Sequence, residues 1–500
     1  MKSNTGNTSV TISSSHSLVR SKVQASLLPE SRLWAWKHLL VILTLVFSDI
    51  LLASLLWGSA LVPQNIWGRG PLQEIAYTLM VFSTALWIGM RALLGLYPGY
   101  GLGPVEELRR QTYAVTATLA VTTVVAFAFQ IGDSLSRLLV GLNFLGLLLL
   151  APLVRYLAKW LMVKVGLWGK PVVIMGAGKT GRLLVRALQN GWGLGLRPVA
   201  VFDPRLAPRG GEIEGVAYGG TGIDALDLGK KQWIDTVIFA MPRIRLEHLS
   251  KLVERASLSF RYVILIPNLA GITTSAVVAR DLAGTLGVEI KHNLLNPWSR
   301  RVKRAFDLFG VIVGGLLISP LLLAIAASIK LTSSGPVLYK QRRPGAAGKY
   351  FDMWKFRTMR ADAEQVLTKL LQSDPDLRVE WEKDHKLRYD PRITRIGRFL
   401  RKTSLDELPQ LWNVLRGEMS LVGPRPILIE EVARYGEVYG LYQRMRPGIT
   451  GLWQVSGRSD TSYEERLAMV AYYVRNWSVW LDLIILTRTA LVGISNRGAF

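Results

Sequence analysis

Four apolar stretches in the first third of the chain constrain its fold more than any other feature. They cover residues 39–62, 75–96, 113–131 and 138–161. Each is close to the ~20 residues that an α-helix needs to cross the hydrocarbon core of a bilayer. Half of the 500 residues are hydrophobic and the mean hydropathy is +0.25, which is unusually high for a soluble protein. Residues 32–169 are therefore predicted to form a four-helix transmembrane domain.

Basic residues at the ends of this domain predict its orientation. They are Arg32 and Lys37 before the first stretch, and Arg155, Lys159, Lys164 and Lys170 after the fourth. The first and third loops carry only Arg69 and Arg137. Because Lys and Arg accumulate on the cytoplasmic side of membrane proteins, both ends of the domain are expected in the cytoplasm. Residues 1–31, rich in Ser, Thr and Asn without an apolar run, are expected to be a disordered tail.

The net charge of +25 narrows the partners that suit the chain. A strongly basic protein binds anionic lipid, anionic substrates or nucleic acid, and the apolar stretches favour a lipid bilayer and no nucleic acid. The chain has no Cys, which excludes disulfides, iron–sulfur clusters and thiolate catalysis. Its five His are scattered, so a bound metal is expected to be a hard cation on carboxylate oxygens.

From residue 170 the pattern changes to alternating strands and helices, which predicts a Rossmann-like α/β domain over residues 170–292. The first strand runs into a turn with Gly176, Gly178 and Gly181, and Asp203 follows a second strand. This spacing is typical of dinucleotide-binding turns, in which a pyrophosphate approaches a helix N-terminus and the acid binds a ribose. The same glycines also permit a tight turn with nothing bound. A nucleotide site and an empty structural turn both remain open.

A fifth apolar stretch, residues 305–331, is long enough to cross a membrane, but its flanks argue against a simple span. Lys and Arg lie on both sides of it, so the positive-inside rule places both ends in the cytoplasm. Ser319 and Pro320 lie near its middle, where proline removes a backbone donor and favours a sharp break. We therefore predict a linker and re-entrant membrane helix over residues 293–331, with a kinked spanning helix as the alternative.

Residues 332–500 are predicted to form a cytoplasmic α/β catalytic domain around two adjacent carboxylates, Asp406 and Glu407. A carboxylate can attack phosphorus and form a phospho-aspartate, provided that cations relieve the repulsion between the anions. Mg²⁺ on Asp406 and Glu407 suits that task. The competing interpretation is a capping box, in which Glu407 bonds to the amide of Ser404. Pro409 disfavours it because proline clashes inside a helix, so we expect a helix that begins nearer Asp406.

Basic residues, several of them beside Pro, Gly or aromatic residues, flank the carboxylates in the sequence. They are Lys355, Arg357, Arg401, Arg425, Arg446 and Arg458. Neighbouring Pro and Gly restrict the backbone, which favours fixed, bidentate contacts between arginine and phosphate. These six residues are the candidate ligands of an anionic substrate.

Four motifs in the last part of the chain are long and specific. They are KFRTM at 355–359, RKTSLDELPQLWNVLRGEMSLVGPRP at 401–426, RPGITGLWQVSGR at 446–458 and YYVRNW at 472–477. Together with the re-entrant Ser-Pro helix, they resemble the bacterial sugar transferase family, the monotopic phosphoglycosyl transferases, in the long form. The resemblance implies an enzyme of the bacterial inner membrane that initiates O-antigen, capsule or exopolysaccharide assembly, with its Rossmann-like and catalytic domains on the cytoplasmic face.

The resemblance also implies a reaction and residue roles. A UDP-hexose would donate hexose 1-phosphate to undecaprenyl phosphate and release UMP, with UDP-galactose as the expected donor and UDP-glucose as the alternative. Asp406 would attack the β-phosphorus, and Glu407 would bind Mg²⁺, with Asp406 as a second ligand. The positions that match phosphate sites of the family are Arg401 and Arg425, and the expected helpers are Lys355, Arg357, Arg446 and Arg458.

Two interpretations from other classes compete with a transferase. An NAD-dependent membrane-bound sugar reductase or dehydratase would place its chemistry on residues 170–292, although the chain has no Tyr-x-x-x-Lys pair. A non-catalytic scaffold would recruit glycosyltransferases and would tolerate the loss of Asp406. The helices and the soluble domains also offer ample surface for a homodimer.

Overall fold

The computed structural model describes residues 30–66, 74–130, 137–203, 211–220, 225, 234–266, 277–282, 285–290, 297–360, 362–373, 377–378, 390–456 and 461–495. The tail predicted over residues 1–31 lies outside these ranges except for its last two residues, which begin a helix. The chain divides into two compact units, Met1–Asn268 and Leu269–Phe500.

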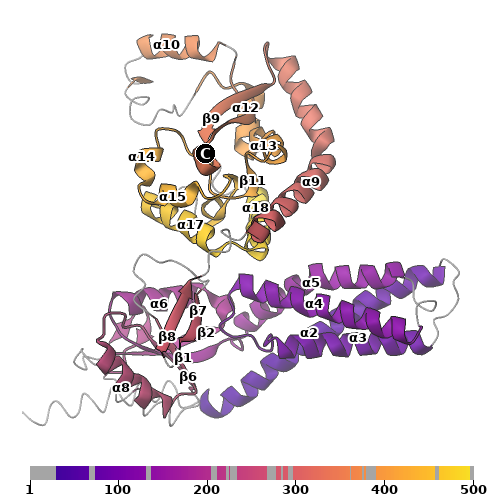
Figure 1. Ribbon diagram of the computed structural model, residues 1–500, viewed down its shortest axis with the longest axis vertical. Coiled ribbons are helices and arrows are strands. Elements are labelled where there is room, and N and C mark those ends of the chain that lie inside the picture. Colours follow the sequence, from indigo (N-terminus) through magenta and orange to yellow (C-terminus); the bar gives the residue numbers. More distant parts are fainter. Residues whose placement is uncertain are drawn as a thin grey trace, which may run out of the picture. The chain divides into compact units, whose positions relative to one another are not determined.

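The first unit begins with four long helices that lie side by side (Figure 1). They are α2 (Glu30–Ile66), α3 (Glu74–Leu93), α4 (Pro104–Ala128) and α5 (Arg137–Lys164). Each contains a stretch long and apolar enough to cross a membrane. One residue from each helix joins a common core: Leu52, Trp87, Ala114 and Phe144. Phe47 and Phe127 are exposed on the outside, so the helices are apolar on both sides, a pattern typical of membrane segments.

Buried charges tie these helices together. Arg91 of α3 donates to Asp49 of α2 across 2.9 Å, and both side chains are buried. Lys159 of α5 lies 2.5 Å from Glu107 of α4, which also pairs with Arg155. Because a buried charge that loses its partner is costly, these pairs fix which helices are neighbours.

A parallel sheet follows the four helices. Its strands are β1 (Lys170–Met175), β2 (Leu196–Phe202), β5 (Thr236–Phe239) and β6 (Tyr262–Leu265), in the spatial order β2-β1-β5-β6. Successive residues of a strand point to opposite faces: Ile174 packs with Val185 of α6 (Lys179–Asn190) on one face. On the other face, Val173 lies in the core that includes Val253 of α8 (Leu246–Ser257). The two helices therefore cover opposite faces of the sheet.

Two short antiparallel pairs lie outside this sheet. They join β3 (Glu212–Ile213) to β4 (Val216–Ala217) and β7 (Val277–Leu282) to β8 (Thr285–Ile290).

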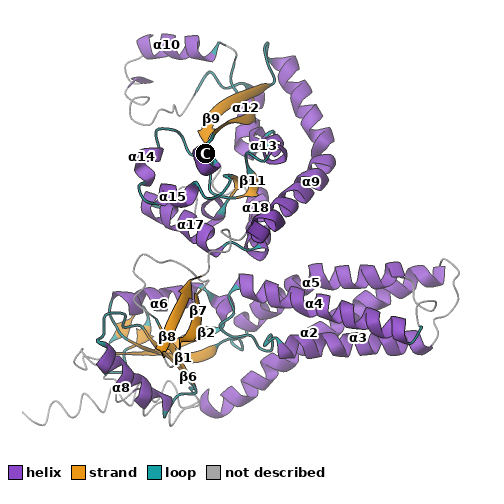
Figure 2. Ribbon diagram, viewed as in Figure 1, coloured by secondary structure: helices purple, strands orange, loops and turns teal. Residues whose placement is uncertain are grey.

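The described part of the second unit is mainly helical (Figure 2). Its helices are α9 (Pro297–Thr332), α10 (Ala363–Ser373), α12 (Arg395–Thr403), α13 (Gln410–Arg416), α14 (Val432–Tyr435), α15 (Val438–Tyr442), α16 (Leu452–Ser456), α17 (Tyr463–Asn476) and α18 (Val479–Ser495). Besides the pair of β7 and β8, its strands form the antiparallel hairpin of β9 (Leu338–Pro344) and β10 (Tyr350–Phe356), and the parallel pair of β11 (Ser420–Val422) and β12 (Gly448–Thr450). Met353 of the hairpin packs with Val414 of α13 in the core.

Helix α9 continues through Pro320, where the sequence predicted a break. Proline leaves the carbonyl of Leu316 without its usual backbone donor, and Ser319 Oγ donates to that oxygen across 2.8 Å. This side-chain hydrogen bond lets the helix continue, and Figure 1 shows that α9 changes direction along its length. The predicted interruption of the helix is therefore wrong, and a bend takes its place.

Both halves of α9 pack against the same domain. In the first half, Val311 lies in a core with Val414 of α13. In the second half, Ile325 lies in a core with Phe356 of β10. Between them, Leu316 is 76% exposed. Both halves of the helix therefore pack on the domain, while its middle exposes an apolar surface.

Two charged residues fasten the first half of α9. Lys303 Nζ lies 2.7 Å from Asp482 of α18 and donates to Val422 O across 3.0 Å. Tyr473 of α17 also donates to Asp482, across 2.6 Å. Asp307 accepts a hydrogen bond from the backbone of β11 across 3.0 Å. The start of α9 is thus joined to three other elements by buried polar contacts.

Candidate active site

The two carboxylates lie in a short 3-10 turn, Leu405–Glu407, between α12 and α13. Ser404 ends α12 with φ 55°, a left-handed conformation that is uncommon outside glycine. Its side chain makes no capping hydrogen bond, so the capping-box interpretation is wrong. The helix expected to begin near Asp406 is also wrong, because α13 begins at Gln410, after Pro409. Proline fits the start of a helix, where its missing N–H has no partner to lose.

Lys355 contacts both carboxylates. Its Nζ lies 2.7 Å from Glu407 Oε1 and 3.8 Å from Asp406 Oδ2. Lys355 is near the end of β10, and the next residue, Phe356, is buried in the core and fixes the strand. The structure thus brings the KFRTM and SLDE motifs together at one point.

The surroundings of Asp406 favour a reactive carboxylate. Its side chain is 13% exposed, and this burial is the main cause that raises its pKa above the ordinary value. The charge of Lys355 opposes the rise, the charge of Glu407 adds to it, and Arg401 opposes it more weakly. Arg401 is held by Thr358 of the KFRTM motif, because its Nε donates to Thr358 Oγ1 across 2.9 Å. Asp406, Glu407, Lys355 and Arg401 therefore form one constellation.

The other predicted basic residues have different surroundings. Arg357 is buried and donates to the backbone oxygen of Ser333 across 2.9 Å, so it joins the end of β10 to the end of α9. Arg446 lies near Arg304 of α9. Burial, and second to it the positive charge of Arg304, lower the pKa of Arg446. Arg458 lies outside the described residues. In the described part of the chain, no hydrogen bond or ion pair joins Arg357 or Arg446 to the carboxylates.

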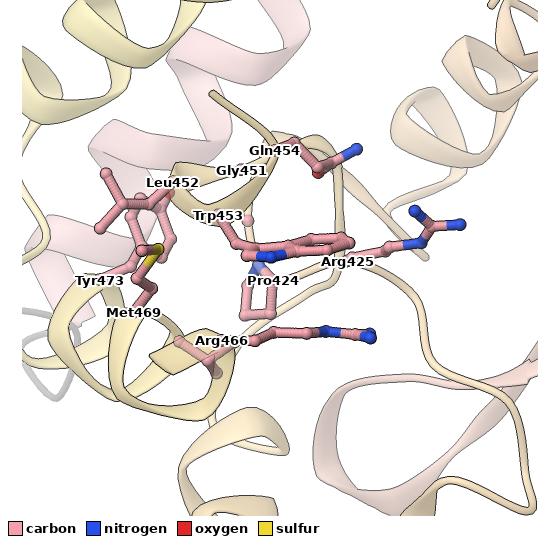
Figure 3. Close-up of a pocket in the computed structure, with 11 residues that line it drawn as sticks. Pro424, Arg425, Gly451, Leu452, Trp453, Gln454, Arg466, Met469 and Tyr473 are labelled. Carbon is pink, nitrogen blue, oxygen red and sulfur yellow. The ribbon is translucent and has the colours of Figure 1, made fainter. Parts of the chain in front are cut away.

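A pocket beside β11 contains the remaining predicted residue, Arg425 (Figure 3). Its lining includes Trp453 of α16 and Arg466 of α17. The guanidinium carbons of Arg425 and Arg466 lie 5.6 Å and 4.6 Å from the ring centre of Trp453. Sequence reasoning singled out neither Trp453 nor Arg466. Trp453 had a signal, an aromatic residue inside a basic motif, whereas Arg466 lies in an ordinary charged helix.

The carboxylate pair suits Mg²⁺ only together with a substrate. No group of three or more His, Cys, Asp or Glu side chains converges on one point among the residues that the structure describes. Asp406 and Glu407 offer oxygen ligands, and Mg²⁺ is usually bound by one or two carboxylates plus substrate phosphates and water. The ammonium of Lys355 beside both carboxylates shows that this position favours positive charge. The residues present therefore fit Mg²⁺ as a partner of a bound phosphate.

The glycine-rich turn after β1 is shaped by its own backbone. Gly176 has φ 116°, and a Cβ on Gly181 would lie 1.8 Å from Gly176 O, so the turn itself requires both glycines. Gly178 immediately precedes α6 and has open space around it. Asp203 is buried, and its Oδ2 accepts a hydrogen bond from Ala177 N across 2.8 Å. The acid that would bind a ribose in a nucleotide site thus supports the turn, and the two interpretations, a nucleotide site and a structural turn, both stay open.

Comparisons with known proteins match both units. Residues 298–496 match the bacterial sugar transferase family, and residues 92–267 match a CoA-binding domain family. An undecaprenyl-phosphate galactose phosphotransferase from Salmonella typhimurium is 38% identical, over 71% of this chain and 74% of that protein. A UDP-galactose-lipid carrier transferase from Erwinia amylovora is 38% identical, over 73% and 77%. A UDP-glucose:undecaprenyl-phosphate glucose-1-phosphate transferase from Escherichia coli is 33% identical, over 72% and 75%.

Proposed function

Since the chain belongs to the bacterial sugar transferase family, we propose that it transfers hexose 1-phosphate from a UDP-hexose to undecaprenyl phosphate and releases UMP. The observation that carries the proposal is the largely buried carboxylate of Asp406, which lies 3.8 Å from Lys355 and near Arg401. This arrangement suits a nucleophile that must approach an anion. The reaction would be the first membrane step in the assembly of O-antigen, capsule or exopolysaccharide.

The proposed transfer has two steps at one phosphorus. An oxygen of Asp406 attacks the β-phosphorus of the UDP-hexose, a bond forms between them, and UMP leaves with the electron pair of the broken phosphorus–oxygen bond. An oxygen of undecaprenyl phosphate then attacks the same phosphorus and releases the carboxylate of Asp406. Each step brings anions together. At ~4 Å and an effective dielectric constant of ~20, each opposite unit charge contributes about 4 kcal/mol, so Lys355 and Arg401 offset much of the repulsion.

We propose Mg²⁺ as the cofactor, held by Asp406 and Glu407. When bound, it would neutralise charge on the phosphoryl oxygens. Glu407 is the better placed of the two to hold a cation, because its Oε1 already lies 2.7 Å from the Lys355 ammonium. Asp406, with the longer contact, keeps an oxygen available for attack. Chelation with EDTA should stop UMP release, and added Mg²⁺ should restore it.

The proposal places the chain in the inner membrane of a bacterium, with the carboxylates at the cytoplasmic face. Helices α2 to α5 would span the bilayer, and α9 would enter and leave it on one side. Val311 and Ile325, in the two halves of α9, pack on one domain, which supports this path. A helix that spanned the bilayer would place its two halves on opposite sides of the membrane. The parallel order β2-β1-β5-β6 supports a Rossmann-like assignment for the α/β part.

Galactose is the proposed sugar because two relatives that are 38% identical are named for it, while the relative named for glucose is 33% identical. Incubating membranes that contain the protein with UDP-galactose and UDP-glucose, side by side, tests the proposal. We expect release of UMP and a lipid-linked galactose phosphate. A sugar-dependent change in nicotinamide absorbance without UMP would support a reductase instead, and the absence of both products would contradict transfer.

A further inference from the structure

Asn413 joins the strand that carries Lys355 to the helix that follows the two carboxylates. It lies in α13 and is fully buried. Its Oδ1 accepts a hydrogen bond from Trp354 N across 3.0 Å, and its Nδ2 donates to Asp352 O across 2.7 Å. Both partners are backbone groups of β10. One side chain therefore fixes two points of the strand to the helix.

The carboxamide of Asn413 takes the place of a neighbouring strand. Among the described residues, β10 pairs with a single strand, β9. In an antiparallel pair, alternate residues direct their backbone groups away from the partner strand, and Asp352 and Trp354 direct theirs to Asn413. Nδ2 also donates to Glu418 Oε2 across 2.7 Å. Because Nδ2 faces two oxygens and Oδ1 faces an N–H, only an amide satisfies all three contacts.

Lys355 comes directly after the part of β10 that Asn413 fixes. It is the next residue after Trp354. Met353, two residues earlier and hence on the same face of the strand as Lys355, packs with Val414 of α13. The strand is therefore attached to α13 by one face, through Met353, and by one edge, through Asn413.

The contact between Lys355 and Glu407 depends on α13 from both sides. Glu407 lies in the turn before this helix, six residues before Asn413. Lys355 Nζ lies 2.7 Å from Glu407 Oε1, and a shift of about 1 Å between strand and helix would lengthen that contact beyond hydrogen-bond range. A displacement of this size in a catalytic site can lower the rate about a hundredfold.

We propose that Asn413 is a positioning residue for the transfer reaction. It keeps β10 in place on α13, so that the Lys355 ammonium meets the carboxylates of Glu407 and Asp406. The proposal rests on the function proposed above and adds to it a residue that acts through Lys355. Alanine at this position would remove both hydrogen bonds to β10, and aspartate would place an oxygen against the backbone oxygen of Asp352.

Asn413→Ala and Asn413→Asp test the positioning role, and Tyr442→Phe is their matched control. Tyr442 is fully buried, and its hydroxyl donates to Pro344 O of the same hairpin across 2.9 Å. Pro344 pairs with Tyr350, which lies five residues before Lys355, or about 17 Å at about 3.4 Å per residue. The control therefore removes a buried hydrogen bond from the hairpin at the end remote from the carboxylates.

The reactivity of Lys355 toward acetic anhydride reports its position without any need for activity. Its side chain is 23% exposed and paired with carboxylates, so it should react slowly in the full-length wild-type protein. Mass spectrometry measures its acetylation relative to Lys369, an exposed lysine of α10. Both Asn413 variants should raise this ratio several-fold, and Tyr442→Phe should leave it unchanged.

UMP release per folded protein is the second readout. Its kcat/KM should fall about a hundredfold in the Asn413 variants and stay near the wild-type value in Tyr442→Phe. Asn413→Asp keeps the size of the side chain and the acceptor for Trp354 N, so it carries the test if Asn413→Ala does not fold. Unchanged Lys355 reactivity in the Asn413 variants, or an equal rise in Tyr442→Phe, would overturn the inference. A wild-type protein that releases no UMP would overturn the proposed function instead, and the reactivity of Lys355 would still be measurable.

Discussion

Lys355 Nζ lies 2.7 Å from Glu407 Oε1, at the meeting point of two motifs that are 52 residues apart. The contact with Asp406 is longer, at 3.8 Å. The two adjacent carboxylates therefore differ in their surroundings. Glu407 is engaged with the Lys355 ammonium, whereas Asp406 makes only the longer contact, as the proposed nucleophile requires.

The pH dependence of activity should respond to Lys355 and Glu407 in opposite directions. Burial raises the pKa of Asp406, and Lys355 opposes this rise. Lys355→Met should therefore move the acid limb of kcat/KM to higher pH, because the pKa of Asp406 rises when the positive charge is lost. Glu407→Gln removes a like charge and should move the residual acid limb to lower pH. UMP release measured across the acid range checks both shifts, and shifts in the same direction would contradict the assignment.

Arg401→Gln should impair catalysis, whereas Arg357→Gln should impair stability. Arg401→Gln should lower kcat/KM about a hundredfold, as for the loss of a group that stabilises charge in a transition state, without changing thermal unfolding. Arg357→Gln removes a buried donor from Ser333 O and should lower the free energy of unfolding by about 1–3 kcal/mol. UMP release per folded protein and unfolding in detergent separate the two effects. A fully stable but inactive Arg357→Gln would place Arg357 at the site instead.

Lys303→Met should destabilise the catalytic domain by about 3–5 kcal/mol, since it leaves a buried charge unpaired. The side chain of Asp482 is 0% exposed and its Oδ2 lies 2.7 Å from Lys303. Adding Asp482→Asn removes that charge and should recover part of the loss. Unfolding of the solubilised protein measures both variants. Equal destabilisation by the single and the double change would argue against a buried ion pair as the anchor of α9.

The path of α9 through the membrane can be tested with single cysteines, because the chain has no Cys of its own. Arg301 and Leu331 are exposed near its two ends. Arg301→Cys and Leu331→Cys should both react with an impermeant maleimide only after the inner membrane is permeabilised. Arg69→Cys, in the first predicted external loop, is the control that should react without it. Reaction of Leu331→Cys without permeabilisation would indicate a spanning helix.

Local patterns in the sequence predicted the elements well. Long apolar runs predicted the four helices α2 to α5, because a continuous apolar stretch of this length is enough to specify a membrane helix. The strand signals of β1 and β2 were equally local. The break at Pro320 was wrong because the sequence rule for proline does not include the hydroxyl of Ser319, which replaces the missing donor. A local rule failed where a side chain supplied what the backbone lacked.

Partners that are distant in the sequence were not predictable in the same way. In the sequence, Arg155 and Lys159 are markers of orientation, and in the structure both are buried against Glu107. The sequence places Arg357 among the candidate phosphate ligands, and in the structure it donates to the backbone oxygen of Ser333. Charge and spacing show that a residue needs a partner, but only the fold selects it.

The most direct test of the covalent mechanism is the mass of the peptide that contains Asp406 after the protein reacts with UDP-hexose in the absence of undecaprenyl phosphate. The wild-type peptide should carry one hexose phosphate, with UMP released in equal amount. The same peptide from Asp406→Asn should carry none, although the variant inserts into membranes normally. A wild-type protein that transfers sugar phosphate to lipid without this adduct, or an Asp406→Asn variant that still transfers it, would contradict the account.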